Sequence, residues 1–313
     1  MNGPASGQVN TVATREMDDQ AAFLQRFEAL RTGVDRRLAE LAPAVGVAPN
    51  RLVEAVRYAL LAPGKRFRPM VTLLAAAEFG APDGAALDAA CAFEMIHTAS
   101  LILDDLPAMD DAGLRRGLPT IHRTYDEATA ILAGVGLLNQ AYAVIAADHA
   151  LPGPLRADLT ARAAEAVGFS GLIAGQARDL FDREKLRDPA VLERLNHEKT
   201  GVLIIAAAQG GAAIAGASSA AVEGVGQWAR HVGLAFQIRD DIIDAQASPE
   251  AAGKDVGKDA AMTTVVSALG VIGARLAMEG HLAKASAALA SAGCGHLLNA
   301  YVGGLFAGRK VAA

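Results

Sequence analysis

The sequence predicts an all-α protein, an antiparallel bundle of about ten helices, from three observations. Helical patterns run along almost the whole chain and break where proline and glycine cluster. No segment shows the sustained period-two alternation of β-branched residues that a half-buried strand requires. Aromatic residues make up only 4% of the chain while small aliphatic residues dominate, and this composition suits closely packed helices better than sheets.

The chain of 313 residues is 52% hydrophobic, which is enough apolar material for one large core. We therefore expect a single all-helical domain over residues 19–313. Residues 1–18 contain no basic region followed by an apolar one, so we predict a flexible N-terminal tail and no signal peptide. The predicted turns between helices lie at residues 62–64, 81–84, 106–107, 151–154 and 188–189.

The net charge of −5 gives no general electrostatic reason to bind nucleic acid or an anionic membrane. Any basic site must therefore be local. Cys91 and Cys294 lie far apart in apolar or small-residue surroundings, without the spacing of a metal or redox site. Buried thiols in a reducing cytosol are the expectation, so we predict a cytoplasmic protein.

The first motif along the chain is the basic turn GKRFRP at residues 64–69. Lys65 and Arg68 can share one face there, and the free backbone amides of a helix start add affinity for anions. Such a turn on its own is usually solvated surface. Cations in other segments of the chain favour an anion site instead. Together with the basic turn they provide more positive charge than one metal-bound diphosphate needs: Arg115, Arg116, Lys199 and Lys254.

An acidic cluster follows the predicted apolar helix that begins near Ala85. Four carboxylates within eight positions, Asp104, Asp105, Asp110 and Asp111, repel one another unless a cation lies among them. Pro107 turns the chain after the helix, which could bring Asp110 back beside Asp104. The alternative is a solvated acidic loop, but the two arginines that follow favour a site for a metal-bound diphosphate.

A second acidic cluster contains Asp240, Asp241 and Asp244. Asp240 and Asp244 are one helical turn apart and can face one point, with Gln237 on the same stripe. Magnesium prefers a few carboxylates together with phosphate oxygens, so two such clusters facing each other would form a cradle for a diphosphate. The uncharged segment 201–222 between the clusters is long enough to span a membrane, but its Ala, Gly and Ser content predicts a buried central helix instead.

Five ordered motifs give the chain a family resemblance: GKRFRP, HTASLILDDLPAMDDAGLRRGLPTIH, GQARDL, the triplet Lys199-Thr200-Gly201, and FQIRDDIID with GKD behind it. The chain resembles the trans-isoprenyl diphosphate synthases, most closely the bacterial geranylgeranyl diphosphate synthases of carotenoid-type pathways. The resemblance implies the isoprenoid synthase fold around a central cavity, a homodimer, and Mg²⁺ as cofactor with three ions. The implied reaction is the head-to-tail condensation of isopentenyl diphosphate with dimethylallyl, geranyl or farnesyl diphosphate.

The resemblance also implies residue roles. The metal ligands would be Asp104, Asp110, Asp240 and Asp244, with Asp105 and Asp241 completing the two catalytic clusters. The allylic diphosphate and its leaving group would contact Arg115, Lys199, Thr200, Gln237 and Lys254. Isopentenyl diphosphate would bind to Lys65, Arg68, His97 and Arg116.

Product length should depend on Ala99 and Ser100, five and four positions before Asp104. Family members that stop at fifteen carbons often place an aromatic ring there, so the small side chains favour the twenty-carbon product. Farnesyl diphosphate synthase is the alternative. The chain departs from the family pattern at Leu118, Val135 and Met262, and Lys258 could substitute for the cation that Met262 replaces.

The same residues argue against three other functions. A terpene cyclase binds one diphosphate and would not need Lys65, Arg68 and Arg116. A head-to-head condensing enzyme would bind two diphosphates, but GKRFRP and FQIRDDIID resemble the head-to-tail branch. A noncatalytic regulatory subunit tends to lose metal carboxylates, all of which are present in this chain.

Overall fold

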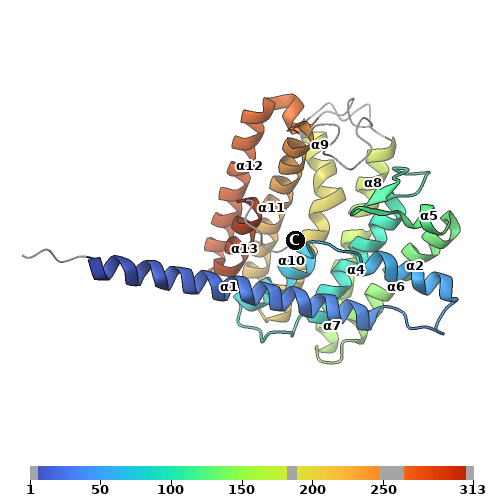
Figure 1. Cartoon of the computed structure of the whole chain (residues 1–313), viewed down its shortest axis with the longest axis horizontal. Helices are drawn as coiled ribbons and strands as arrows, with labels where there is room; N and C mark the ends of the chain where they lie inside the picture. Colours follow the sequence, from blue (N-terminus) through green and yellow to red (C-terminus); the bar gives the residue numbers. More distant parts are fainter. Residues whose placement is uncertain (1–5, 182–188, 247–263, 308–313) are drawn as a thin grey trace, which may run out of the picture.

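The computed structural model describes residues 6–181, 189–246 and 264–307, and these residues form an almost entirely helical bundle (Figure 1). The all-α prediction is confirmed. The first half of the bundle consists of α1 (Ser6–Leu41), α2 (Asn50–Leu60), α3 (Phe67–Glu78), α4 (Leu87–Asp104), α5 (Ile121–Thr124), α6 (Glu127–Ala147) and α7 (Gly153–Val167). The second half consists of α8 (Leu172–Phe181), α9 (Pro189–Asn196), the π-helical turn η2 (His197–Gly201), α10 (Val202–Ile214), α11 (Ser219–Gln246), α12 (Val265–Ser291) and α13 (His296–Phe306).

One feature was not predicted. Strands β1 (Leu114–Arg115) and β2 (Leu118–Pro119) pair antiparallel in a short hairpin between α4 and α5. Each strand has two residues, too few to produce an alternation that could be recognised in the sequence.

Local sequence sets where several helices begin. The Asp126 side chain accepts a hydrogen bond from the backbone N–H of Thr129 at 2.6 Å and so caps α6. Thr264 and Ser267 form a reciprocal capping box at the start of α12, with hydrogen bonds of 3.1 and 2.8 Å. Proline and glycine occupy most of the remaining turns, as the sequence predicts.

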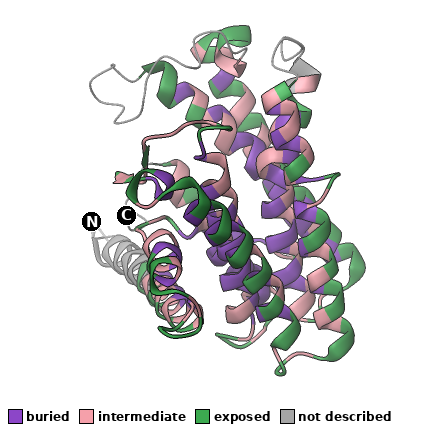
Figure 2. Ribbon diagram, turned by 90° about the vertical axis from the view of Figure 1, so that its right-hand side faces the viewer, coloured by how far each residue is buried: buried purple, intermediate pink, exposed green. Residues whose placement is uncertain are grey.

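The core lies between the central helices, where Figure 2 shows buried residues along their inward faces. The predicted buried helix in segment 201–222 is α10, but it ends at Ile214, and α11 begins at Ser219. Gly211 of α10 lies so close to α3 that a Cβ atom there would be 2.1 Å from the carbonyl oxygen of Thr72. Glycine at this position therefore allows the two helices to touch through their backbones.

By length and composition alone, two of the described helices could cross a membrane, α6 and α12. In their most apolar windows, 39% of the α6 residues and 6% of the α12 residues are buried inside the chain. The side chains of Ile131, Leu132 and Val135 form an exposed apolar patch on α6.

The domain division stays a prediction, and α1 runs from Ser6 across the expected boundary at residue 18.

The feature that matters for function is the direction of two helices. The hairpin that follows α4 and the C-terminal end of α11 both lie at the same end of the bundle, the upper one in Figure 1. The two acidic clusters are therefore at one end of the molecule.

Candidate active site

The first acidic cluster folds back on itself at the C-terminal end of α4. The backbone N–H of Asp110 donates to the carbonyl of Asp104 at 2.9 Å, so the turn after Pro107 returns the chain to the helix end as expected. Burial, together with Asp110 and Asp105, raises the pKa of the Asp104 carboxyl to about 6 against the lowering effect of Lys199 and Arg115. Asp104 is thus a carboxylate that gains from a nearby cation.

Asp105 has a different environment from Asp104. It is buried, and its Oδ1 accepts hydrogen bonds from Arg115 Nε, at 2.9 Å, and from Arg115 Nη2. The ion pair fixes β1 against the end of α4. Asp105 therefore orients Arg115, which agrees with a supporting role beside Asp104.

Lys199 faces the first cluster from η2. Its Nζ donates to Asp179 Oδ2 of α8 at 2.6 Å, and the carboxylates of Asp104 and Asp110 also lie near enough to raise its pKa against the opposing effect of burial. π-Helical turns are rare and occur often at functional sites. Thr200, the next residue of η2, is half-buried.

The motif GQARDL lies in α8, where Asp179 binds Lys199 and Gln176 is one turn before it. The sequence alone suggested no role for either residue. Gln176 is buried, and its Oε1 and Nε2 atoms have no hydrogen-bond partner among the described residues. A buried amide without partners is costly, so these atoms are available to a ligand. The spacing of one helical turn between Gln176 and Asp179 was the signal that could have identified the pair.

The second acidic cluster lies in the last two turns of α11. Asp240 and Asp244 are exposed, whereas Asp241 accepts hydrogen bonds from Gln237 Nε2 and from the backbone N–H of Val265, both at 3.2 Å. Asp241 and Gln237 thus bind each other and the start of α12. Asp240 and Asp244, one helical turn apart, are the two exposed carboxylates of this cluster.

Glycines hold α11 beside η2. A Cβ atom on Gly233 would be 3.4 Å from the Cα of Gly201, in ordinary contact, so the backbones of α11 and η2 pass close to each other. Gln237 lies one turn beyond Gly233 and Asp240 two turns beyond it. The turn η2, which carries Lys199 beside the first acidic cluster, therefore also contacts α11 two turns before Asp240.

The predicted residues of the basic turn gather against α4 and the hairpin. Lys65 is exposed, while Arg68, His97 and Arg116 are half-buried. Burial and the facing cations, Arg68 first among them, hold the pKa of His97 well below its usual value, so the imidazole is neutral at pH 7. A neutral imidazole can donate one hydrogen bond to an anion.

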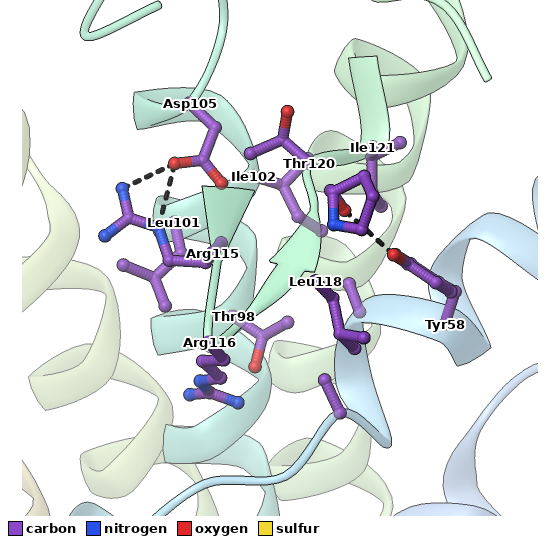
Figure 3. A pocket seen from close by; sticks show the side chains of 13 residues that line it. Tyr58, Thr98, Leu101, Ile102, Asp105, Arg115, Arg116, Leu118, Thr120 and Ile121 are labelled. Carbon is purple, nitrogen blue, oxygen red and sulfur yellow. Dashed lines mark hydrogen bonds and ion pairs between the residues drawn. The ribbon is translucent and has the colours of Figure 1, made fainter. Parts of the chain in front are cut away.

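A small pocket lies between α2, α4 and the hairpin (Figure 3). Tyr58 closes one side and donates to the carbonyl of Pro119 at 2.9 Å, and the Asp105–Arg115 pair closes another. The Oγ1 atom of Thr98 in its lining has no hydrogen-bond partner among the described residues. Leu118, one of the departures from the family pattern, lines this pocket.

The carboxylates fit magnesium better than a metal that needs a closed cage. In the part of the chain that the structure describes, no three His, Cys, Asp or Glu side chains are grouped so that they could hold a metal ion. Magnesium needs only one or two carboxylates and completes its shell with waters and phosphate oxygens. Asp104 and Asp110, whose backbones bond to each other at one helix end, are carboxylates that fit this requirement.

The other predicted residues lie as follows. Ala99 is buried in the core with 1% exposure, and Ser100 is half-buried with its hydroxyl donating to the His97 carbonyl at 2.9 Å. Val135 is exposed on α6. Lys254, Lys258 and Met262 lie outside the described residues.

Comparison with known proteins identifies the family. The family model described as Polyprenyl synthetase matches residues 49–283. A geranylgeranyl diphosphate synthase of Pantoea ananas is 42% identical over 272 residues, which cover 86% of this chain and 88% of that protein. A farnesyl diphosphate synthase of Geobacillus stearothermophilus is 39% identical over 289 residues, which cover 91% of this chain and 96% of that protein.

Solved structures of similar proteins have the same fold. An apo FPP/GFPP synthase from Zymomonas mobilis superposes with a TM-score of 0.81 at 33% identity, covering 93% of this chain and 99% of that one. A geranyltransferase from Helicobacter pylori, complexed with magnesium and isoprenyl diphosphate, superposes with a TM-score of 0.82 at 28% identity, covering 91% and 98%. Enzymes of this family depend on Mg²⁺. The chain belongs to the polyprenyl synthetase family and is a trans-prenyltransferase.

Proposed function

We propose that the enzyme makes geranylgeranyl diphosphate by condensing isopentenyl diphosphate head to tail with dimethylallyl, geranyl or farnesyl diphosphate. The observation that carries the twenty-carbon product is the pair of small side chains at Ala99 and Ser100, one turn before Asp104 on α4. Neither side chain is large enough to stop a product chain that grows along this helix. The 42% identity to a geranylgeranyl diphosphate synthase supports the same product, while the farnesyl diphosphate synthase at 39% keeps fifteen carbons as the alternative.

The two acidic clusters hold the cofactor in this proposal. The ligands of three magnesium ions would come from Asp104, Asp110, Asp240 and Asp244. Bound Mg²⁺ would stabilise the negative charge that develops on the departing diphosphate. Asp105 keeps Arg115 turned toward the same leaving group, and Asp241 keeps Gln237 and the start of α12 in place.

The remaining residues bind the two substrates separately. Lys199, Thr200, Arg115, Gln237 and Lys254 contact the allylic diphosphate. Its departure leaves an allylic cation, which the double bond of isopentenyl diphosphate attacks. The released diphosphate then accepts the proton that the new intermediate loses, so no protein side chain need act as the base.

The nucleophile binds beside α4 at His97, about two helical turns before Asp104. Lys65, Arg68 and Arg116 supply positive charge for its diphosphate, and neutral His97 donates a hydrogen bond. Because this second anion site is separate from the acidic clusters, the enzyme can hold two diphosphates at once. A terpene cyclase would need only one such site.

We also propose a cytoplasmic homodimer. The apolar patch of Ile131, Leu132 and Val135 on α6 is a surface that a second copy of the chain could bury. The expectation from the family resemblance that the uncharged Ala/Gly-rich segment after Lys199 lies near the dimer surface stays a prediction. That segment forms α10, which is mostly buried within the chain itself.

Product analysis tests the proposed function. The purified chain is incubated with Mg²⁺, isopentenyl diphosphate and each allylic diphosphate in turn, and the dephosphorylated products are separated by length. The proposal expects twenty-carbon product from every starter and none in the presence of EDTA. Fifteen carbons as the final length would replace it with the alternative product.

A further inference from the structure

Glu94 is a buried carboxylate that neither the sequence motifs nor the proposed function uses. It lies on α4 with 1% exposure, in a helix whose neighbouring positions are apolar. Its Oε1 accepts a hydrogen bond from Arg66 Nη1 at 3.0 Å and lies 3.4 Å from Arg116 Nη2. An ionised carboxylate costs much free energy to bury unless cations lie beside it. The burial of Glu94 therefore depends on Arg66 and Arg116.

Arg66 connects Glu94 to the basic turn. It is 4% exposed, and its Nε, Nη1 and Nη2 atoms donate to Asp35, Glu94 and the carbonyl of Ala62 at 2.7, 3.0 and 2.9 Å. Its backbone has the left-handed φ of 47°, which non-glycine residues rarely adopt. Each guanidinium nitrogen of Arg66 thus donates to a protein acceptor. These bonds hold the strained turn that also carries Lys65 and Arg68.

Arg116 approaches Glu94 from the hairpin. It too has a left-handed φ, of 55°, and it packs on Gly64 so closely that a Cβ atom there would be 3.1 Å from its Cζ. Glu94 therefore contacts both the basic turn, through Arg66, and the hairpin, through Arg116. The carboxylate joins two segments that carry the cations predicted for the second diphosphate.

The cations around Glu94 are not fully compensated. Burial lowers the pKa of the Arg68 guanidinium to about 10, an effect that Glu94 opposes and Arg116 reinforces. Arg68 Nε has no hydrogen-bond partner among the described side chains and backbone atoms. The protein thus supplies enough negative charge to bring the arginines together, but leaves positive charge available to an anion.

We propose that Glu94 is a positioning residue for the isopentenyl diphosphate site, an inference that rests on the proposed function. Glu94 does not touch the substrate. It holds Arg66 in the basic turn and Arg116 in the hairpin, so that Arg68 and Arg116 face one diphosphate. Without its charge, the three arginines repel one another and Arg116 moves outward. The allylic site at Asp104 and Lys199 has its own ion pairs and keeps its geometry.

The substitution Glu94→Gln tests the inference because it preserves shape and removes the charge. We expect the KM for isopentenyl diphosphate to rise by about tenfold or more, while the KM for the allylic substrate changes by less than about twofold. A purely structural role would change both KM values alike or only lower the melting temperature. An unchanged KM for isopentenyl diphosphate, or an equal rise in both values, overturns the inference.

Two further variants separate charge from folding. Glu94→Asp keeps the charge at shorter reach, and its KM for isopentenyl diphosphate should fall between those of the wild type and Glu94→Gln. If Glu94→Gln does not fold, Glu94→Asp carries the test, and a wild-type KM in that variant contradicts the inference. The matched control is Asp88→Asn on the same helix, because the bonds of Asp88 at 2.7 and 2.9 Å go to Arg37 of α1 and not to Arg66, Arg68 or Arg116. Asp88→Asn should lower stability and leave both KM values unchanged.

Direct binding distinguishes failure of this inference from failure of the proposed function. Titration calorimetry with isopentenyl diphosphate alone needs no turnover. If the wild-type chain makes no prenyl product from any starter, the proposed function fails. The inference still requires that Glu94→Gln bind isopentenyl diphosphate about tenfold more weakly than the wild type, and equal affinities would refute it.

Discussion

Lys199 Nζ lies 2.6 Å from Asp179 Oδ2, and this ion pair joins η2 to α8 next to the first acidic cluster. The pair forms because the two elements touch through their backbones. A Cβ atom on Gly175 of α8 would lie 2.5 Å from the backbone nitrogen of Lys199 and 2.8 Å from the carbonyl carbon of Glu198. Glycine at position 175 is therefore a requirement for the position of Lys199.

Gly175→Ala should displace η2, because backbone atoms cannot yield as a side chain would. We expect a loss of about 1–3 kcal/mol in the free energy of unfolding and a fall in kcat with it. Chemical denaturation and steady-state assays measure the two effects. Gly280→Ala on α12 is the control, since a Cβ atom there meets nothing within 4 Å, and it should be neutral or stabilising. Equal kcat values for the two variants would show that the close approach does not position Lys199.

The raised pKa of Asp104 predicts a cost to folding that depends on pH. Its folded pKa of about 6 lies above the ordinary value, so the protonated form is favoured in the fold. The carboxyl is neutral in both states at low pH, and its destabilising effect grows as the pH rises toward and past 6. In EDTA, Asp104→Asn should therefore be more stable than the wild type by about 1–2 kcal/mol at pH 7, with the difference vanishing near pH 4.

Thermal melts of both proteins between pH 4 and 8 measure this difference. Mg²⁺ should reverse the order at pH 7, because it stabilises the charged carboxylate that the Asn variant lacks. A difference in melting temperature that does not change with pH would mean that Asp104 is not a desolvated carboxylate.

Ser100 and Ala99 make separable predictions about product length. Ser100 is half-buried, so Ser100→Phe can place its ring beside the growing chain and should shift the main product toward fifteen carbons. Ala99 has 1% exposure in a packed core, so Ala99→Phe should shift the product too but cost about 1–3 kcal/mol of stability. Product chromatography and denaturation measure both. An unchanged twenty-carbon product from both variants removes this explanation of chain length.

The apolar patch on α6 predicts the oligomeric state. Leu132 is 59% exposed, and Leu132→Asp would place a charge where the second chain is proposed to pack. We expect the wild type to sediment as a dimer and the variant as a monomer. Ile272→Asp on α12 is a control with a more exposed residue, and it should remain dimeric. A dimeric Leu132→Asp protein would place the interface elsewhere.

Particular residues show why some features could be predicted from the sequence and others could not. The return of Asp110 to Asp104 follows from local rules, because Pro107 must turn the chain after an apolar helix. Asp241 looked like one more acid of the second cluster, yet it binds the start of α12, a partner more than twenty positions away. The burial of Glu94 could not be predicted from the sequence, because the two arginines that compensate its charge, Arg66 and Arg116, come from two other segments of the chain.

The hairpin at residues 114–119 could not be predicted for another reason. Its two-residue strands carry no periodicity, and the left-handed backbone at Arg116 has no compositional signal of its own. The family resemblance nonetheless predicts that Arg115 and Arg116 bind the substrates. Their orientation toward Asp105 and Glu94 came only from the structure.

The most direct test is whether both acidic clusters are needed to bind one diphosphate through magnesium. Titration calorimetry with inorganic diphosphate in excess Mg²⁺ compares the wild type with Asp104→Asn, Asp240→Asn and the control Asp88→Asn. We predict that Asp104→Asn and Asp240→Asn each weaken binding by at least about tenfold, and that Asp88→Asn binds as the wild type does. Wild-type affinity in either cluster variant would contradict a diphosphate held between the two clusters.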